Sequence, residues 1–468
     1  MAGSFVKEKA APLFVLAVLA AGAYLPALTQ PFISDDYPNI GLALAYGPIS
    51  GWEAMANDSV QRPRATTFIL SYAIYHLFGP RPAAFYSANI LLHVLNCWLL
   101  FAAGRWRAIG YQASFWAAVF FAVYEGHSEA IMWFSACNEL LMFFFGFLSF
   151  VFWLVFLERE AARLPWLALS FFFFIPALLS KESSVIFIAL FTLPLFFPKL
   201  KLRQTPYLLP HILICVPYVI AIFMTRSHSF RFNDRSFVLS APFWVTWTNS
   251  YGRMLWFWGL SATISMFLWG RSGRNELRAE TMKINHEGFK NAKVFHDLLR
   301  ALRSFVVGFR ERAYGQIFLP SFIWMGISFI PYMFVDYMHR IPSRQTYLAS
   351  AGLAWLVGAA VVVMKERCGK NYKWAPPLVL LLILTHNVAY LWTKKRQQFL
   401  ERAQPTERLL SLARSVDGPI FVKCFPLAQL HAEAALKLIL NKPADTLVWD
   451  EEEAKSKRLG VGQTLVCP

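Results

Sequence analysis

The sequence is short of charge for its length, because only 16% of its 468 residues are Asp, Glu, Lys or Arg. Ordinary soluble domains carry about 25% charged residues, so a water-soluble globular enzyme and a disordered protein both fit poorly. Cysteine is scarce as well: the chain has six, and none of them shows a metal-ligand spacing. Six cysteines are too few for a disulfide scaffold in a chain of this size.

Apolar and aromatic side chains are present in excess. Hydrophobic residues make up 57% of the chain and aromatic residues 17%, led by 44 Phe. The formal net charge is +17, which in a soluble chain would suggest nucleic-acid binding. In so apolar a chain we expect no nucleic-acid partner. The composition instead predicts an α-helical polytopic membrane protein.

Eleven apolar segments are candidates for membrane-spanning helices, which need about 20 residues each. They lie at 11–29, 83–103, 112–127, 138–157, 164–180, 184–198, 207–226, 242–269, 316–335, 347–364 and 374–393. Lys7 and Lys9 precede the first segment, and no small-residue cleavage site follows it. We therefore expect a retained anchor rather than a signal peptide.

Lys and Arg are unevenly distributed between these segments. With the N-terminus on the cytoplasmic side, the inner loops hold 23 of them and the outer loops nine before the tail. Cytoplasmic loops of membrane proteins are enriched in basic residues, so this orientation is the expected one. It places the C-terminus on the outer (periplasmic or lumenal) side, and we expect a bacterial inner membrane.

The chain divides into a transmembrane domain, 1–393, and a small outer-side C-terminal domain, 394–468. Within the first, the outer loop 30–82 is half apolar and predicts short helices on the membrane surface. The inner segment 271–315 alternates apolar and basic residues at helical spacing, which favours a helix on an anionic leaflet over a docking helix for a partner. The tail predicts a small α/β cap, in which Cys424 and Cys467 would pair in an oxidising compartment.

Ionisable residues beside the hydrocarbon are costly and indicate function. In this topology they gather on the outer side. They are Asp35, Asp36, Glu125, His127, Glu129, Glu139, Lys181, Glu182, Arg226, Asp336, His339, Arg340 and Arg344. Carboxylates serve as a general base or bind a cation, while Lys, Arg and His hold phosphate. This mixture beside lipid suits a substrate whose phosphate is attached to a membrane-buried chain.

Simpler interpretations exist for each signal taken alone. An Asp-Asp pair after a span is commonly a helix cap or a solvated loop. Lys181 and Glu182 are explained equally well as an interfacial charge pair in a tight turn as by a functional role. The Trp-rich stretches WVTWTN and LWFWG are more typical of an aromatic belt than of a sugar-stacking platform.

The order of four motifs resembles the GT-C superfamily of membrane glycosyltransferases. These motifs are FISDDYPNI, the segment from RPRATTF to LLHVLN, GHSEAIMW and LLSKESS. The resemblance is closest to the branch of protein O-mannosyltransferases and the tetratricopeptide-repeat mannosyltransferases, and it covers roughly residues 5–200. Two departures stand out. Gly126 replaces a Pro that often precedes the His, and no tetratricopeptide repeats follow.

This resemblance implies an inverting hexosyltransferase that uses a polyprenyl-phosphate-linked sugar. By position, Asp35 would act as the base with Asp36 beside it. The implied ligands of the donor phosphate are His127, Lys181, Arg340 and Arg344, and Glu129 and Glu182 would hold a metal or the acceptor. No cofactor is expected to be required, although the carboxylates would allow a divalent cation. The expected partners are the lipid-linked donor, a protein Ser/Thr or glycan acceptor, and membrane lipids.

Three other classes of membrane protein compete with this interpretation. A lipid or solute transporter also has many spans, but it places its ionisable groups near the midplane. A polysaccharide polymerase or ligase faces outward too, but relies more on Arg and His than on an acidic pair after the first span. A structural assembly subunit would need no convergence of acidic and basic groups.

Overall fold

The computed structural model describes residues 2–47, 51–58, 64–161, 163–226, 242–270, 315–333, 341–367 and 374–466. The predicted inner segment 271–315 lies outside the described residues, apart from Gly315. Arg340, one of the predicted phosphate ligands, lies outside them as well.

Helices form at each of the eleven apolar segments. The helices of this part are α1 (Ala2–Tyr24), α5 (Pro82–Ala102), α6 (Tyr111–Val123), α8 (Cys137–Glu158), α9 (Leu164–Leu178), α10 (Phe187–Phe196), α11 (Leu209–Arg226), α13 (Phe243–Met254), α14 (Leu260–Gly270), α17 (Gly315–Phe329), α18 (Ser350–Arg367) and α19 (Ala375–Tyr390). By length and composition, five stretches among the described residues can cross a membrane, and five shorter apolar helices accompany them. The chain is an integral membrane protein, and the number of eleven spans stays a prediction.

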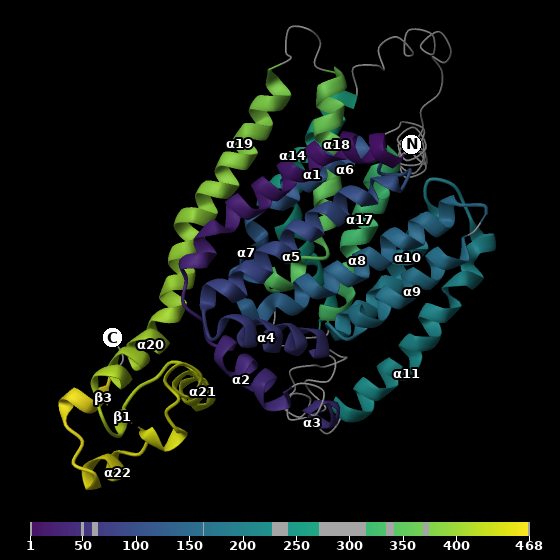
Figure 1. Ribbon diagram of the computed structural model, residues 1–468. Helices are drawn as coiled ribbons and strands as arrows, with labels where there is room; N and C mark the ends of the chain where they lie inside the picture. Colours follow the sequence, from purple (N-terminus) through teal and green to yellow (C-terminus); the bar gives the residue numbers. More distant parts are fainter. Residues whose placement is uncertain are drawn as a thin grey trace, which may run out of the picture.

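Helix α6 lies at the centre of the bundle, where it packs against α1, α5 and α18 (Figure 1). Every side chain from Ala117 to Val123 is buried. Gly358 of α18 faces this helix so closely that a Cβ there would lie 2.2 Å from the carbonyl oxygen of Ala113. Small residues at such contacts let helix backbones approach in a membrane protein, where apolar burial alone gives no preference for a neighbouring helix over lipid.

The first outer loop contributes three short helices, as its apolar pattern predicts. They are α2 (Asp36–Tyr46), α3 (Trp52–Asn57) and α4 (Ala65–Phe78). They cover one end of the bundle, and the N-terminus and the far end of α19 lie at the other (Figure 1). Helix α2 packs against α4 and also against the C-terminal region.

The C-terminal region begins as a continuation of α19. Helix α19 passes through the π-helical turn η14 (Leu391–Lys395) into α20 (Arg396–Ser415) without a break. The predicted domain boundary between residues 393 and 394 therefore falls inside a continuous helix. The apolar run ends there, but α20 stays helical because it buries Leu409, Leu410 and Ala413.

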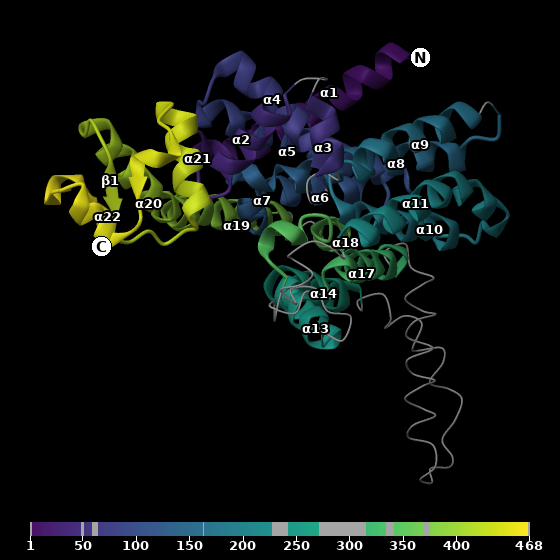
Figure 2. The same ribbon diagram turned by 90° about the horizontal axis from the view of Figure 1, so that it is seen from below.

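The cap follows α20 and projects to one side of the bundle (Figure 2). Its elements are β1 (Ile420–Val422), α21 (Gln429–Leu440), β2 (Leu447–Val448), α22 (Glu451–Ser456) and β3 (Thr464–Leu465). The strands are parallel in the order β2-β1-β3, with Ile420 opposite Leu447 and Phe421 opposite Thr464. Cys424 is in a disulfide bond, and Cys467 lies outside the described residues.

Candidate active site

Asp36 is a fully buried carboxylate at the first turn of α2. It accepts hydrogen bonds from the backbone N–H of Ile33 at 2.9 Å and from the backbone N–H and hydroxyl of Ser135, each at 2.7 Å. Burial raises the pKa of Asp36 to about 6, although these hydrogen bonds oppose the rise. Asp36 therefore fixes the loop after the first helix against the turn that precedes α8.

Asp35, one residue earlier, has the opposite environment. Its side chain is 47% exposed, and its Oδ1 lies 2.8 Å from Nε2 of His431 in α21 of the cap. The Nδ1 of His431 lies 3.2 Å from the carbonyl oxygen of Ala428. Both ring nitrogens thus lie within hydrogen-bonding distance of an oxygen atom. Of the acidic pair, Asp35 is the carboxylate that a substrate can reach.

Glu129 forms the centre of a second polar cluster. Its carboxylate accepts hydrogen bonds from the Ser343 hydroxyl at 2.7 Å and from Arg344, and it lies 3.8 Å from Nη1 of Arg402 in α20. Burial alone would raise the pKa of Glu129, but Ser343 and the two arginines outweigh it and lower that pKa. Glu129 is therefore held as an ionised carboxylate.

Trp133 joins this cluster to the acidic loop. The guanidinium groups of Arg344 and Arg402 lie 4.8 and 4.7 Å from the centre of a Trp133 ring, within cation–π distance. The indole N–H donates to the carbonyl oxygen of Ile33 at 3.3 Å, one turn before Asp36. Trp133 therefore contacts both the loop that carries Asp35 and Asp36 and the cluster around Glu129.

His127, predicted to bind the donor phosphate, lies in the core. It is fully buried, and its Nε2 is 2.6 Å from the hydroxyl oxygen of Ser350. Its ring contacts Phe121 and Tyr347 at centroid distances of 4.3 and 4.5 Å. These contacts anchor the turn that carries Glu129, and in this conformation they leave the ring no exposed edge for a phosphate.

Lys181 and Glu182 lie in ion pairs with other elements. Lys181 is buried and pairs with Glu139 at the start of α8, while Glu182 lies 3.6 Å from Arg64. Burial lowers the pKa of Lys181, and the adjacent Glu139 opposes this effect. Glu139 therefore offsets the charge of Lys181, the predicted phosphate ligand. Lys181 and Glu182 do form charge pairs, but with Glu139 and Arg64 and not with each other.

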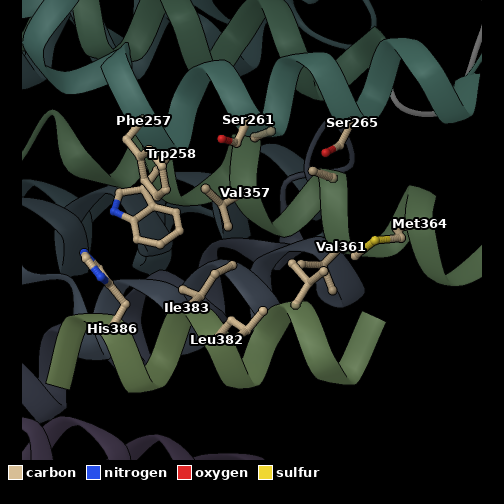
Figure 3. A pocket seen from close by; sticks show the side chains of 13 residues that line it. Phe257, Trp258, Ser261, Ser265, Val357, Val361, Met364, Leu382, Ile383 and His386 are labelled. Atoms are coloured by element: carbon tan, nitrogen blue, oxygen red, sulfur yellow. The ribbon is translucent and has the colours of Figure 1, made fainter. Parts of the chain in front are cut away.

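Three adjoining cavities lie beside these clusters. The first, an apolar groove of about 410 Å³, lies between α14, α18 and α19, and Figure 3 shows Trp258 and His386 at one end of it and Met364 at the other. The second, which we name the cation cavity, has a volume of about 440 Å³ and shares Trp258 and His386 with the groove. Its lining includes Tyr124, Glu125, Gly126, Arg253, Met254, Trp256, Phe257, Trp258, Ser343, His386, Tyr390 and Lys395. The third, the Glu129 cavity, measures about 500 Å³ and shares Ser343 and Lys395 with the cation cavity.

Both π-helical turns found in the described part of the chain border the cation cavity. One is η9 (Leu255–Gly259) between α13 and α14, which supplies Trp256 and Trp258. The other is η14, which supplies Lys395. Single π-helical turns inside α-helices are frequent at functional sites.

Comparison with known proteins gives a likeness in structure and none in sequence. No protein-family model and no curated protein matches the sequence. The oligosaccharyltransferase AglB from Archaeoglobus fulgidus aligns over 95% of this chain with a TM-score of 0.51 and 12% identity. The fold is similar to that of AglB. The O-mannosyltransferase-like branch stays a prediction.

The chain spans 64% of the length of that AglB structure, which contains an inhibitory peptide and a dolichol-phosphate. ArnT from Cupriavidus metallidurans, bound to undecaprenyl phosphate, aligns over 95% of this chain and 86% of its own, with 14% identity and a TM-score of 0.46. At these identities the comparison with AglB establishes the fold alone.

Several residues of the site escaped sequence reasoning. Lys395, Arg402 and His431 lie in the predicted C-terminal domain 394–468, which the sequence separates from the bundle because the apolar run ends near residue 393. A run of helix formers beyond that point, RQQFLERAQ, was the available signal that the last span continues.

The described residues do not gather a metal site. Among them, no three His, Cys, Asp or Glu side chains converge to hold an ion. The oxygens of Asp36 and Glu129 already accept hydrogen bonds from protein donors. A divalent cation stays a prediction of the sequence.

Proposed function

We propose that this chain is an inverting glycosyltransferase that moves a sugar from a polyprenyl-phosphate donor to an acceptor hydroxyl. The observation that carries the proposal is the order in which the three cavities adjoin. The apolar groove shares lining residues with the cation cavity, and the cation cavity shares lining residues with the Glu129 cavity, which Arg402 links to Trp133. This sequence of environments matches the parts of such a donor, a hydrocarbon chain, a phosphate and a sugar.

The groove suits the hydrocarbon chain. Its walls carry mainly aliphatic and aromatic side chains, and the polar groups are those of Ser261, Ser265 and His386 and the indole N–H of Trp258. Ligand pockets of this kind are mostly apolar with a few placed polar groups. A prenyl chain entering between α14 and α19 would leave its phosphate at the His386 end.

The phosphate would then lie among Arg253, Lys395 and His386 in the cation cavity. Arg253 is exposed and Lys395 lies 5.7 Å from the Tyr390 ring, so both long side chains border the cavity. Cations placed where negative charge grows on a leaving phosphate stabilise the transition state. His127 and Lys181 remain ligands implied by resemblance only, and their burial favours Arg253 and Lys395 in that role.

The transfer would proceed by attack of the acceptor oxygen on the anomeric carbon. A bond forms between that oxygen and carbon, the bond from the carbon to the phosphate oxygen breaks, and its electron pair stays on the phosphate. Asp35 takes the proton of the acceptor hydroxyl. Opposite-face attack inverts the anomeric carbon. A general base typically contributes 10²–10⁴-fold to such a rate.

The likeness to AglB supports the choice of donor class, because that protein binds a dolichol-phosphate within the same fold. We further propose a hexose as the sugar and a protein Ser/Thr or a glycan as the acceptor. The N-terminus would lie in the cytoplasm, and the site and cap would lie on the outer side of a bacterial inner membrane.

The test uses full-length protein in proteoliposomes containing a polyprenyl-phosphate hexose, with a mixture of Ser/Thr peptides and glycans outside. Sugar transfer is measured by mass spectrometry, and donor binding is measured separately. We expect Asp35→Asn to lower transfer at least about a hundredfold with donor binding unchanged. Full activity of that variant would remove Asp35 from the mechanism. Lipid movement across the vesicle without any transfer would favour the transporter instead.

A further inference from the structure

A fourth cavity, of about 560 Å³, lies at the far ends of α5 and α8. Helix α8 begins two residues after Ser135, which binds Asp36, and ends at Glu158, which lines this cavity. Its 22 residues span about 33 Å at 1.5 Å per residue, close to the thickness of a bilayer's hydrocarbon core. The cavity and the candidate active site thus lie at opposite membrane boundaries. We name it the basic cavity.

Three loops bring cations into the basic cavity. Six basic and two acidic side chains line it: Arg105, Arg107, Arg159, Arg163, Lys199, Lys201, Glu158 and Glu160. In the sequence these residues belong to three separate basic loops that predict the membrane orientation. In the fold they line one cavity. The excess of positive charge there attracts an anion.

Internal contacts hold several of these cations in place. Arg105 contacts Glu158 through Nε at 3.2 Å and Nη2 at 3.0 Å, and the Nη2 of Arg163 donates to the Tyr207 hydroxyl at 2.7 Å. Lys201 donates to the carbonyl oxygen of Leu157 at 3.0 Å. The site is therefore partly preorganised, which lowers the entropic cost of binding a ligand.

Among the described residues, few carboxylates offset the remaining positive charge of the basic cavity. Of the six cations, only Arg105 makes an ion pair with a carboxylate that the structure describes. Burial lowers the pKa of Lys201, and the neighbouring Arg107 lowers it further by like-charge repulsion. Arg107 and Lys199 are exposed at the rim, so a bound anion would relieve this repulsion.

We infer that the basic cavity binds the phosphodiester headgroup of an anionic phospholipid. Its place at a membrane boundary brings a headgroup to it without leaving the bilayer, and basic pockets between helices on the cytoplasmic side bind such headgroups. The guanidinium group of arginine donates two parallel hydrogen bonds to phosphate oxygens. Trp106 forms part of the apolar lining, and its indole N–H donates to the carbonyl oxygen of Phe197 at 2.9 Å. This site is independent of the proposed transfer reaction.

The test compares full-length wild type with the double variant Arg107→Ala/Lys199→Ala, which removes two rim cations that contact no described carboxylate. The matched control is Arg203→Ala/Lys365→Ala, which removes the same charge from exposed positions on the same predicted face but outside the cavity. Native mass spectrometry of protein from mixed phosphatidylglycerol and phosphatidylcholine vesicles counts the retained lipids.

We expect wild type to retain phosphatidylglycerol selectively, and the double variant to bind it roughly thirtyfold more weakly, since each cation near the surface contributes about 1 kcal/mol. The control should change by less than about threefold. Equal losses in both variants would indicate general surface charge and overturn the site, as would unchanged binding in the double variant. Inorganic phosphate that displaces the lipid with comparable affinity would assign the cavity to a soluble anion and overturn the lipid proposal.

Discussion

The buried carboxylate of Asp36 should make the stability of the protein depend on pH in a measurable way. Burial raises its pKa from 3.8 to about 6 in the folded state. Its contribution to stability is therefore fully present below pH 3.8 and is lost as the pH rises through about 6. Between pH 5 and pH 8 this linkage amounts to about 1.4 kcal/mol, which is roughly 3 °C or less in melting temperature for a chain of this length.

Asp36→Asn removes that ionisation while keeping one acceptor oxygen. The amide NH₂ then faces the N–H of Ile33 or Ser135, and leaving one buried donor unpaired costs about 1–3 kcal/mol at every pH. Melting temperatures in one detergent from pH 5 to pH 8 should show the wild-type advantage over the variant shrinking with rising pH. The control is Asp35→Asn, which removes a charge from the half-exposed neighbour but keeps the buried carboxyl of Asp36, so this variant should keep most of the wild-type dependence of melting temperature on pH. A constant difference between wild type and Asp36→Asn would refute the argument from burial.

Three further predictions concern the proposed reaction. His431→Ala should lower kcat about tenfold with little change in donor KM, and His431→Gln, which keeps a hydrogen-bond donor near Asp35, should restore most of the lost kcat. Glu433→Ala on the same helix is the control, and equal effects of His431→Ala and His431→Gln would exclude positioning of Asp35 through this hydrogen bond. Val361→Trp should narrow the apolar groove and raise KM for long-chain donors but not for donors of one or two prenyl units, so an equal effect on both would place the lipid elsewhere. Arg402→Ala should lower kcat/KM about tenfold by releasing one side of Trp133, measured with Arg402→Lys as a partial rescue, and a full rescue would argue against the stacked geometry.

The local features of this fold could be predicted from local sequence. Helices form wherever the chain has a long apolar run, and the loop after the first run carries the acidic pair beside the bundle. The different environments of the two acids could not be predicted that way. Asp36 is buried because Ser135, about a hundred residues later, supplies two donors to it, whereas Asp35 faces outward.

The cation cavity was out of reach of sequence reasoning for a similar reason. Arg253 is a charge within the predicted span 242–269, but nothing in the local sequence pairs it with Lys395 or His386. Their meeting depends on how α13, η9 and α19 pack. Conversely, the apparent functional signal of His127 was misleading about exposure. The same His-x-Glu motif occurs whether the His ring faces solvent or is buried, so the motif alone does not predict exposure. Here the ring is buried and anchors the turn through Ser350.

The continuous helix Ala375–Ser415 links the parts of the proposed reaction. It lines the groove with Leu382 and His386, borders the cation cavity with Lys395, places Arg402 against Trp133 and then packs against the cap that carries His431. The 16 residues from His386 to Arg402 rise about 24 Å, a separation fixed by helix geometry rather than by loops. Trp392 fastens the middle of this helix by donating to the carbonyl oxygens of Gly22 and Ala23 in α1, the helix that leads to the acidic loop. One helix therefore carries part of the lipid groove and Arg402, and the cap that holds His431, the partner of Asp35, packs against the end of that helix. A shift of that helix on donor binding would move both ends together, which gives the cap a physical reason to be continuous with the last span.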